Sequence, residues 1–433
     1  MNPNDTLSIS RLSVKNYRKF ASYVVTFDSR LTLLTGDNAS GKTTLLDAAC
    51  VCLGAFLTKL EHTKGVSIAT SDVLTVFTKQ GLNYDKQLLF PSTVSAHGFV
   101  LGNKAEWSRS LKSAKSATTR IDAAPMIEAS EKAQAMISGG DANFILPVLV
   151  RYSTDRLWIP TAKTNFSNSD FTSSRTMGYE NCLHSSANEA KMTQWFKKMT
   201  LWEWQNKRLN PAFSAVKNAV SKVFSEIAGF PGAELDYDLE TEGLALSYSD
   251  SNGHYHREPL GSLSDGYRCT LSLIADIARR MATLNPALGE HALDTPGIVM
   301  IDEVDLHLHP RWQAQIISDL LSVFPNIQLI ATTHSPTVVA SVKKQHIRIL
   351  SADGAKAPIV ETYGHDSNSI LEAIMGSDSR PKPIRELFTR FSDQLEAEKY
   401  NEAEDTLNQL EIEISSDDPG LAAARAVLSL ERE

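Results

Sequence analysis

The most informative stretch of the sequence lies between residues 36 and 44. Gly36 and Gly41 enclose four residues, and Lys42, Thr43 and Thr44 follow directly. Glycines at this spacing let a loop turn its backbone N–H groups toward phosphate oxygens, and a helix that begins after the second glycine presents its positive end to the same anion. We expect the Lys42 ammonium to contact the β- and γ-phosphates of a nucleotide and the Thr43 hydroxyl to bind Mg²⁺. The expected nucleotide-binding residues of this loop are Gly36, Asn38, Ser40, Gly41, Lys42, Thr43 and Thr44.

Two adjacent carboxylates and a histidine could complete a site for hydrolysis. Asp302 and Glu303 end the apolar run that begins at Gly297. At the end of a buried strand, Asp302 can reach the Mg²⁺ bound by Thr43, and Glu303 is suited to orient the attacking water or take its proton. His334 ends the next apolar run, where it could sense the γ-phosphate, although a lone histidine is more often structural. We therefore expect ATP hydrolysis with Mg²⁺, with Glu303 and His334 as catalytic residues.

A second anion-binding feature lies far along the chain from Lys42. Ser264 and Gly266 stand just before a helix that we predict over Arg268–Thr283, with Ser264 or Asp265 as its cap. Both features can serve one ATP if two copies of the protein face each other and each contributes Ser264 and Gly266 to the nucleotide of the other. The sequence therefore predicts a homodimer or a higher homo-oligomer.

Short apolar runs alternate with helical patterns around these residues, which is typical of a parallel α/β sheet. Buried strands are expected over residues 31–34, 146–150, 297–303 and 327–331, and the final strands over 347–350 and 359–362. Alternating apolar and polar residues predict antiparallel strands over 7–14 and 23–27 and within 87–110.

Other segments favour helices. Residues 187–228 and 311–324 have helical patterns, and 235–239 with 244–248 favour a hairpin. Near the C-terminus, 384–395 and 403–414 predict two helices joined at 399–401.

These patterns divide the chain into four expected parts. Residues 1–110 form the N-terminal part of an ATPase domain, and 111–255 form a helical insertion lobe. Residues 256–365 form the C-terminal part of the ATPase domain, with both carboxylates and His334. Residues 366–433 form an acidic helical extension.

Three charged segments have alternative interpretations. Arg18, in the turn between the first two strands, could contact phosphate, but a solvated turn is about as plausible. The basic segment 103–143 could touch nucleic acid, although a solvated surface is the more common explanation. The acidic stretch 393–418 could dock a basic partner or be a solvated helix face.

Composition limits the class of protein. The net charge of −8 excludes a uniformly basic surface for nucleic acid, and no apolar run is long enough for a membrane helix. The N-terminus lacks the pattern of a signal peptide, and the four cysteines lack metal-site spacing. We therefore expect a cytoplasmic protein without a membrane partner.

Taken in order, these motifs resemble those of ABC-type ATPases. The segments 36–44, 263–267 and 298–303 are similar to the Walker A, signature and Walker B motifs, and Asp305 and His334 to the D-loop and switch histidine. The order and the large insertion resemble the RecF/SMC-like and OLD-like branch. Leu146-Pro147, Tyr152, Arg156-Leu157-Trp158 and the acidic C-terminus resemble more closely the PtuA ATPase subunits of Septu anti-phage defence and their retron-associated relatives.

The resemblance carries specific expectations. It implies an α/β ABC-type ATPase head, which is a P-loop parallel sheet with an antiparallel β subdomain, plus a helical insertion lobe and a C-terminal helical hairpin. It also implies that Asp305 contacts nucleotide, and that the protein dimerises around ATP and regulates a partner nuclease of the HNH type (PtuB-like). DNA, or a retron reverse transcriptase with its DNA, is a further candidate partner. The nuclease module of the OLD family has no visible counterpart, so we expect no nuclease activity in this chain. A low ATP turnover is a separate expectation.

Two other functions compete with this one. A RecF-like DNA-repair ATPase shares the same motifs, and an ATP-switched scaffold that hydrolyses slowly would also bind nucleotide. The Asp302–Glu303 pair favours a capacity for hydrolysis over an inert scaffold, and the lack of long heptad repeats argues against an SMC arm.

Overall fold

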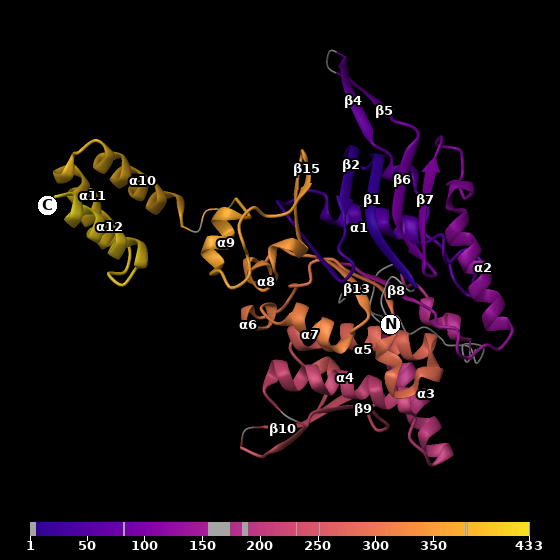
Figure 1. Cartoon of the computed structure of the whole chain (residues 1–433). Coiled ribbons are helices and arrows are strands. Elements are labelled where there is room, and N and C mark those ends of the chain that lie inside the picture. Colours follow the sequence, from indigo (N-terminus) through magenta and orange to yellow (C-terminus); the bar gives the residue numbers. More distant parts are fainter. Residues whose placement is uncertain are drawn as a thin grey trace. The chain divides into compact units, whose positions relative to one another are not determined.

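The computed structural model describes residues 6–432 apart from 81–82, 155–173, 184–188, 231, 251, 377 and 379. The chain forms two compact units, Met1–Asp366 and Ser367–Glu433 (Figure 1). Residues 156–158, which contribute to the Septu-like motif, lie outside the described part. Among the described residues, no helix combines the length and the apolar character that a membrane crossing requires.

A six-stranded sheet forms the centre of the first unit. Its strand order is β15 (Gly354–Lys356), β14 (Ile347–Ser351), β3 (Leu31–Thr35), β13 (Ile327–Thr332), β12 (Gly297–Ile301) and β8 (Val148–Tyr152). All neighbours pair in parallel except β15, which is antiparallel to β14. Strands β3, β8, β12 and β13 are buried along their whole length, as continuous apolar runs predict. The predicted parallel α/β core is thus confirmed, and β8 within the range 111–255 is its edge strand.

An antiparallel sheet lies beside the parallel one in the same unit (Figure 1). Its order is β2 (Phe20–Thr26), β1 (Leu7–Tyr17), β6 (Ser92–Val100) and β7 (Asn103–Leu111), which matches the strands expected there. The buried Gln328 side chain of β13 accepts from the Ile9 backbone N–H and donates to the Ile9 carbonyl oxygen of β1. Helix α1 (Lys42–Leu53) packs against β6 and β7, so the antiparallel sheet supports the helix that follows the phosphate loop.

A hairpin of this region was not expected from the sequence, and a helix occurs at the start of the predicted helical lobe. Strands β4 (Thr75–Gln80) and β5 (Asn83–Leu88) form a separate hairpin, and helix α2 (Ala124–Ser138) follows β7. Of the two basic residues of β7, Lys104 is exposed, whereas Arg109 is buried and donates to the carbonyl oxygens of Val51 and Thr119. Arg109 therefore serves packing and does not offer its charge to nucleic acid.

Three long helices and a small sheet form the lower part of Figure 1. These are α3 (Glu189–Asn206), α4 (Pro211–Ala228), α5 (Asp265–Leu284) and the sheet of β9 (Glu234–Asp238), β10 (Gly243–Ser249) and β11 (Tyr255–Pro259). On α5, the fully buried Asp276 accepts hydrogen bonds from Arg279, Arg280 and the Tyr152 hydroxyl. Since Tyr152 ends β8, this buried cluster fixes α5 against the parallel sheet.

Two sequence expectations for this unit were wrong. The helix predicted over 311–324 is divided into α6 (Pro310–Gln313) and α7 (Ile316–Val323). Residues 359–362 form no strand, because Ile359 and Val360 face solvent with 93% and 48% of their surface exposed. Instead, the Glu361 carboxylate accepts the backbone N–H groups of Lys344 and Thr362, which fixes an irregular turn.

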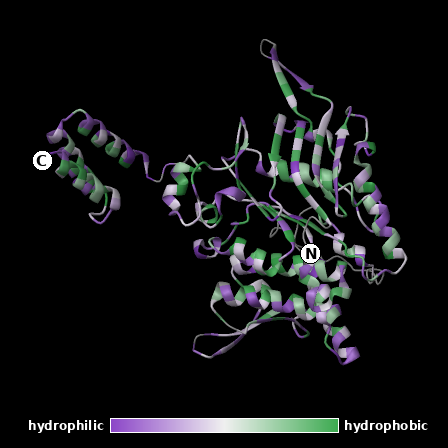
Figure 2. Ribbon diagram, in the orientation of Figure 1, coloured by the Kyte–Doolittle hydropathy of each residue, from purple (hydrophilic) through white to green (hydrophobic). Residues whose placement is uncertain are grey.

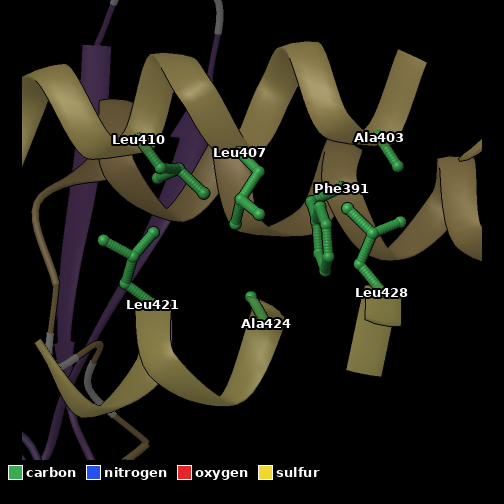
Figure 3. Packing of buried hydrophobic residues seen from close by; sticks show 7 residues of the cluster. All are labelled: Phe391, Ala403, Leu407, Leu410, Leu421, Ala424 and Leu428. Carbon is green, nitrogen blue, oxygen red and sulfur yellow. The ribbon is translucent and has the colours of Figure 1, made fainter. Parts of the chain in front are cut away.

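The second unit is a small helical bundle after the short α9 (Ser367–Ala373). Its helices are α10 (Lys382–Glu396), α11 (Tyr400–Glu413) and α12 (Pro419–Glu431). The predicted hairpin corresponds to α10 and α11, and the third helix was missed. Hydrophobic and hydrophilic residues are interspersed along these helices (Figure 2), and seven apolar residues meet between them (Figure 3). This cluster consists of Phe391, Ala403, Leu407, Leu410, Leu421, Ala424 and Leu428.

Candidate functional site

The loop from Gly36 to Lys42 has the backbone of a phosphate cradle. Gly36, Ala39 and Gly41 all have positive φ, at 143°, 61° and 104°, so the loop curls tightly after β3. Gly41 is the N-cap residue of α1, and Lys42 is its first residue. The first-turn N–H groups of α1 therefore face the loop interior, where the helix dipole favours an anion. The backbone of Ala39 is left-handed although the residue is not a glycine, which strains the loop modestly.

Lys42 is already held over this loop. Its Nζ donates to the carbonyl oxygens of Gly36 and Asp37, at 2.8 and 3.1 Å, and only 6% of the residue is exposed. Burial lowers the pKa of Lys42, and the negative charges of Asp302 and Glu303 oppose that shift. The two carboxylates that follow β12 thus lie within electrostatic reach of the loop lysine.

The two carboxylates are held differently by the next strand. The Thr332 hydroxyl, at the end of β13, donates to Asp302 Oδ1 at 2.6 Å and accepts from the Glu303 backbone N–H at 2.7 Å. Asp302 is 1% exposed, whereas Glu303 is partly exposed and has φ at 48°. The two carboxylates thus differ in their exposure to solvent, so they can take different roles.

Asp305 and His334 lie in neighbouring loops at the same edge of the sheet. Asp305 accepts a hydrogen bond from the Thr333 hydroxyl at 2.5 Å, and His334 follows Thr333 directly and is half-buried. The Ser335 hydroxyl then donates to the Gln313 side chain at 2.7 Å, and Gln313 donates to the Leu308 carbonyl oxygen. The loop after β12 and the loop after β13 are therefore joined into one hydrogen-bonded frame.

Ser264 and Gly266 lie at the start of α5. Ser264 is its N-cap residue and is exposed, so its hydroxyl is open to a second molecule. Gly266 is buried, and a Cβ there would lie 2.7 Å from the His307 carbonyl oxygen and 3.1 Å from the Trp312 ring. The next residue, Tyr267, packs on Trp312 with ring centroids 4.4 Å apart. The visible role of Gly266 is thus close packing against the loop that carries Asp305.

Arg18 is engaged in ion pairs. Its guanidinium contacts Asp47 at 2.5 Å and Asp72 at 2.9 Å, and its backbone N–H donates to the Asp72 carbonyl oxygen. Its neighbours in the same turn reach the phosphate loop instead: Lys19 Nζ donates to the Ala39 carbonyl oxygen, and a Cβ on Gly41 would lie 2.4 Å from the Phe20 ring. The turn therefore does support the loop, through residues that the sequence analysis did not single out.

Arg151, Asp47 and Thr332 were also missed. Arg151 follows an apolar run in β8, and Asp47 lies one turn after Thr43 on α1. Arg151 pairs with Asp47 at 2.8 Å and lies 3.9 Å from Asp302 Oδ2. Only the charge of Arg151 within a buried strand pattern could have indicated its importance, because charged side chains are rarely buried unless they are paired.

The donors present suit Mg²⁺ bound together with a nucleotide. No group of three or more His, Cys, Asp and Glu that could hold a metal is found among the described residues. Thr43 is exposed in the first turn of α1, and Asp302 is a buried carboxylate near Lys42. One hydroxyl and one carboxylate, with phosphate oxygens and water as the other ligands, match the preference of Mg²⁺ for hard oxygen donors.

The chain is similar in sequence to proteins that are already known. Residues 31–340 match the family described as "AAA domain, putative AbiEii toxin, Type IV TA system". "Retron Vc95 probable ATPase" of Vibrio cholerae serotype O1 biovar El Tor is 42% identical over 124 residues, which are 28% of this chain and 24% of that protein. "Septu protein PtuA" of Bacillus mycoides (strain KBAB4) is 32% identical over 189 residues, which are 42% of this chain and 24% of that protein. The chain thus spans about a quarter of the length of these curated relatives.

Solved structures of SMC head domains are also similar to the chain. The head domain with a coiled coil and joint from Pyrococcus yayanosii covers 84% of this chain and 99% of its own, with 12% identity and a TM-score of 0.47.

Proposed function

Because this chain belongs to the family described as "AAA domain, putative AbiEii toxin, Type IV TA system", we propose that it binds ATP with Mg²⁺ and hydrolyses it to ADP and phosphate. The observation that carries this proposal is the buried Lys42 ammonium, held over the loop after β3 and within electrostatic reach of Asp302 and Glu303. Lys42 is distant in sequence from the adjacent Asp302 and Glu303, and their convergence supports a site for phosphoryl transfer to water.

Each residue has a role in this proposal. The loop N–H groups and Lys42 bind the β- and γ-phosphates. Thr43 and Asp302 would hold Mg²⁺, which supplies charge to the phosphate oxygens. Glu303 takes a proton from the attacking water, whose oxygen bonds to the γ-phosphorus as the bond to the β-phosphate oxygen breaks. His334 orients the γ-phosphate from the neighbouring loop.

Dimerisation around ATP is the second part of the proposal. Ser264 is exposed at the positive end of α5, and the packing of Gly266 against His307 joins that end to the loop of Asp305. A second copy that presents Ser264 to the γ-phosphate would place Asp305 at the same interface. A movement of Ser264 would then also displace Asp305, and the reverse.

A role in anti-phage defence is the third part. It is supported by the similarity to proteins named as a retron ATPase and as Septu PtuA. By this analogy the chain would act in the cytoplasm with low ATP turnover and control a nuclease of the HNH type, with DNA or a retron reverse transcriptase and its DNA as further partners. Co-purification of the native protein, with identification of the chain that accompanies it, tests this part.

Phosphate release by the purified chain tests the enzymatic part. Wild-type protein should release phosphate from ATP in the presence of Mg²⁺, and Glu303→Gln should slow release by about 10²–10⁴-fold while ATP still binds. The exposed Glu240→Gln serves as a matched control, and it should keep the wild-type rate. If Glu303→Gln hydrolyses ATP at the wild-type rate, Glu303 is not the base. If the wild-type chain binds ATP without any turnover, the scaffold alternative is favoured.

A further inference from the structure

A row of alternating charges runs from Asp72, past the turn between β1 and β2, to the candidate Mg²⁺ ligand. In order, the charge row consists of Asp72, Arg18, Asp47, Arg151 and Asp302. Each neighbouring pair is 2.5–2.9 Å apart except the last, because Arg151 lies 3.9 Å from Asp302. The row thus ends in one loose contact, at the carboxylate that the proposed function assigns to Mg²⁺.

Arg151 is placed to act on Asp302 by the register of the sheet. In the β8–β12 pair, Tyr152 lies opposite Ile301, and the Asp302 backbone N–H donates to the Tyr152 carbonyl oxygen. The Arg151 side chain is 9% exposed, so its charge is little screened by solvent. A cation at this distance from a buried carboxylate competes with any metal ion for its negative charge.

Asp47 determines how closely Arg151 can approach Asp302. The Arg151–Asp47 contact of 2.8 Å anchors the guanidinium to α1, one turn after Thr43. Within the described residues, the buried Nε of Arg151 makes no hydrogen bond, and the ion pair of its Nη2 with Asp47 is shorter than the contact with Asp302, at 2.8 Å against 3.9 Å. A cavity of about 260 Å³ is lined by Asp47 and Arg151 together with Arg18 and Asp72. The other carboxylate oxygen of Asp302, Oδ1, accepts the Thr332 hydroxyl, which fixes Asp302 when Arg151 moves.

We propose that Arg151 is a positioning residue, anchored by Asp47, that sets the Mg²⁺ affinity of the nucleotide site through Asp302. While Asp47 holds Arg151 at a distance, Asp302 keeps an oxygen for the metal. When the anchor is lost, the guanidinium closes on Asp302 and Mg²⁺ binds less tightly. Because α1 also carries Lys42 and Thr43, the row couples the position of that helix to the carboxylate at the end of β12. This inference rests on the proposed function, in which Asp302 is a Mg²⁺ ligand.

The test is a Mg²⁺ titration of nucleotide binding, which does not depend on turnover. Fluorescence of an N-methylanthraniloyl ATP reports binding to the full chain, and the quantity measured is the Mg²⁺ concentration at half-saturation. Asp47→Asn should raise that concentration by about 10–100-fold, which is the usual loss of metal affinity when a residue that orients a metal ligand is changed. Arg151→Met should lower it, because the competing cation is gone. Arg151→Lys keeps the charge and should stay close to wild type, as should the control Asp72→Asn at the far end of the row.

The opposite signs separate positioning from a merely structural role. If Asp47→Asn and Arg151→Met both leave the half-saturation value unchanged, or both raise it, the inference is wrong. Melting temperatures identify variants that fail to fold, and if Arg151→Met is among them, Asp47→Asn and Arg151→Lys decide the question. If the wild-type chain binds no nucleotide, or binds it equally well without Mg²⁺, the proposed function itself fails.

Discussion

An alanine in place of Gly41 should destabilise the nucleotide-binding loop by about 2–5 kcal/mol, because two separate penalties meet at this position. Gly41 has φ at 104°, and the backbone strain for any L-residue there is about 1–2 kcal/mol. The new Cβ would also lie 2.4 Å from the buried Phe20 ring, which packs on Tyr23 with centroids 4.4 Å apart. Forcing that ring aside adds about 1–3 kcal/mol to the free-energy cost.

A matched control separates the two penalties. Gly140 has φ at 74° and open space around it, so Gly140→Ala should show the strain term alone, about 1–2 kcal/mol. Removing the ring instead, by Phe20→Ala, should lower the free energy of unfolding by about 3–5 kcal/mol. In the double variant of Gly41 and Phe20 the clash is absent, so its loss should be about 1–3 kcal/mol smaller than the sum of the single losses.

Urea unfolding followed by circular dichroism measures these differences. The reasoning is refuted if the losses of Gly41→Ala and Phe20→Ala simply add, or if Gly41→Ala is no more harmful than Gly140→Ala. Either result would mean that the Phe20 ring does not restrict the loop, and that the turn between β1 and β2 is not its support.

Three further predictions concern separate parts of the first unit. Burial raises the pKa of Asp319 to about 6, above the value of about 4 in the unfolded chain. The folded state therefore holds this proton more tightly, and the stability that the protonated carboxyl contributes is lost as the pH rises from about 4 to about 6. Asp319→Asn should therefore raise the melting temperature at about pH 7 but not at about pH 4. Asp276→Asn weakens the pairing of two buried arginines and should lower the free energy of unfolding by about 3–5 kcal/mol, seen as a lower urea midpoint. Ser264→Arg should abolish ATPase activity alone, yet mixing it with Lys42→Ala should partly restore phosphate release. If mixed dimers form and stay inactive, the shared-site arrangement is wrong or hydrolysis needs both sites.

Local patterns were enough to predict the phosphate loop and most strands. The loop depends on glycine spacing over a few residues, and strands such as β3 and β13 are continuous apolar runs in the sequence. Their parallel order places Lys42 near Asp302, since the carboxyl ends of neighbouring strands lie at one edge of the sheet. This is why residues far apart in sequence could be assigned to one site.

Long-range pairing could not be predicted in the same way. Nothing near Arg18 shows that its guanidinium meets Asp47 and Asp72, and the ion pair of Arg151 with Asp47 depends on how α1 packs beside β8. The apolar residues at 359–362 also led to a wrong prediction of a strand, because the side chains of Ile359 and Val360 face solvent. Helix α12 was missed because only a few of its residues, Leu421, Ala424 and Leu428 among them, face the cluster in Figure 3.

Direct titration of Mg²⁺–ATP into the purified chain, followed by calorimetry, tests the central claim most directly. Wild-type protein should bind ATP saturably, and Lys42→Ala should weaken binding by at least about 100-fold, because charge-assisted hydrogen bonds to phosphate contribute about 1.5–3 kcal/mol each. The exposed Lys104→Ala, which removes the same side chain from the start of β7, should bind like wild type. Equal ATP affinity of the wild type and Lys42→Ala would contradict the account.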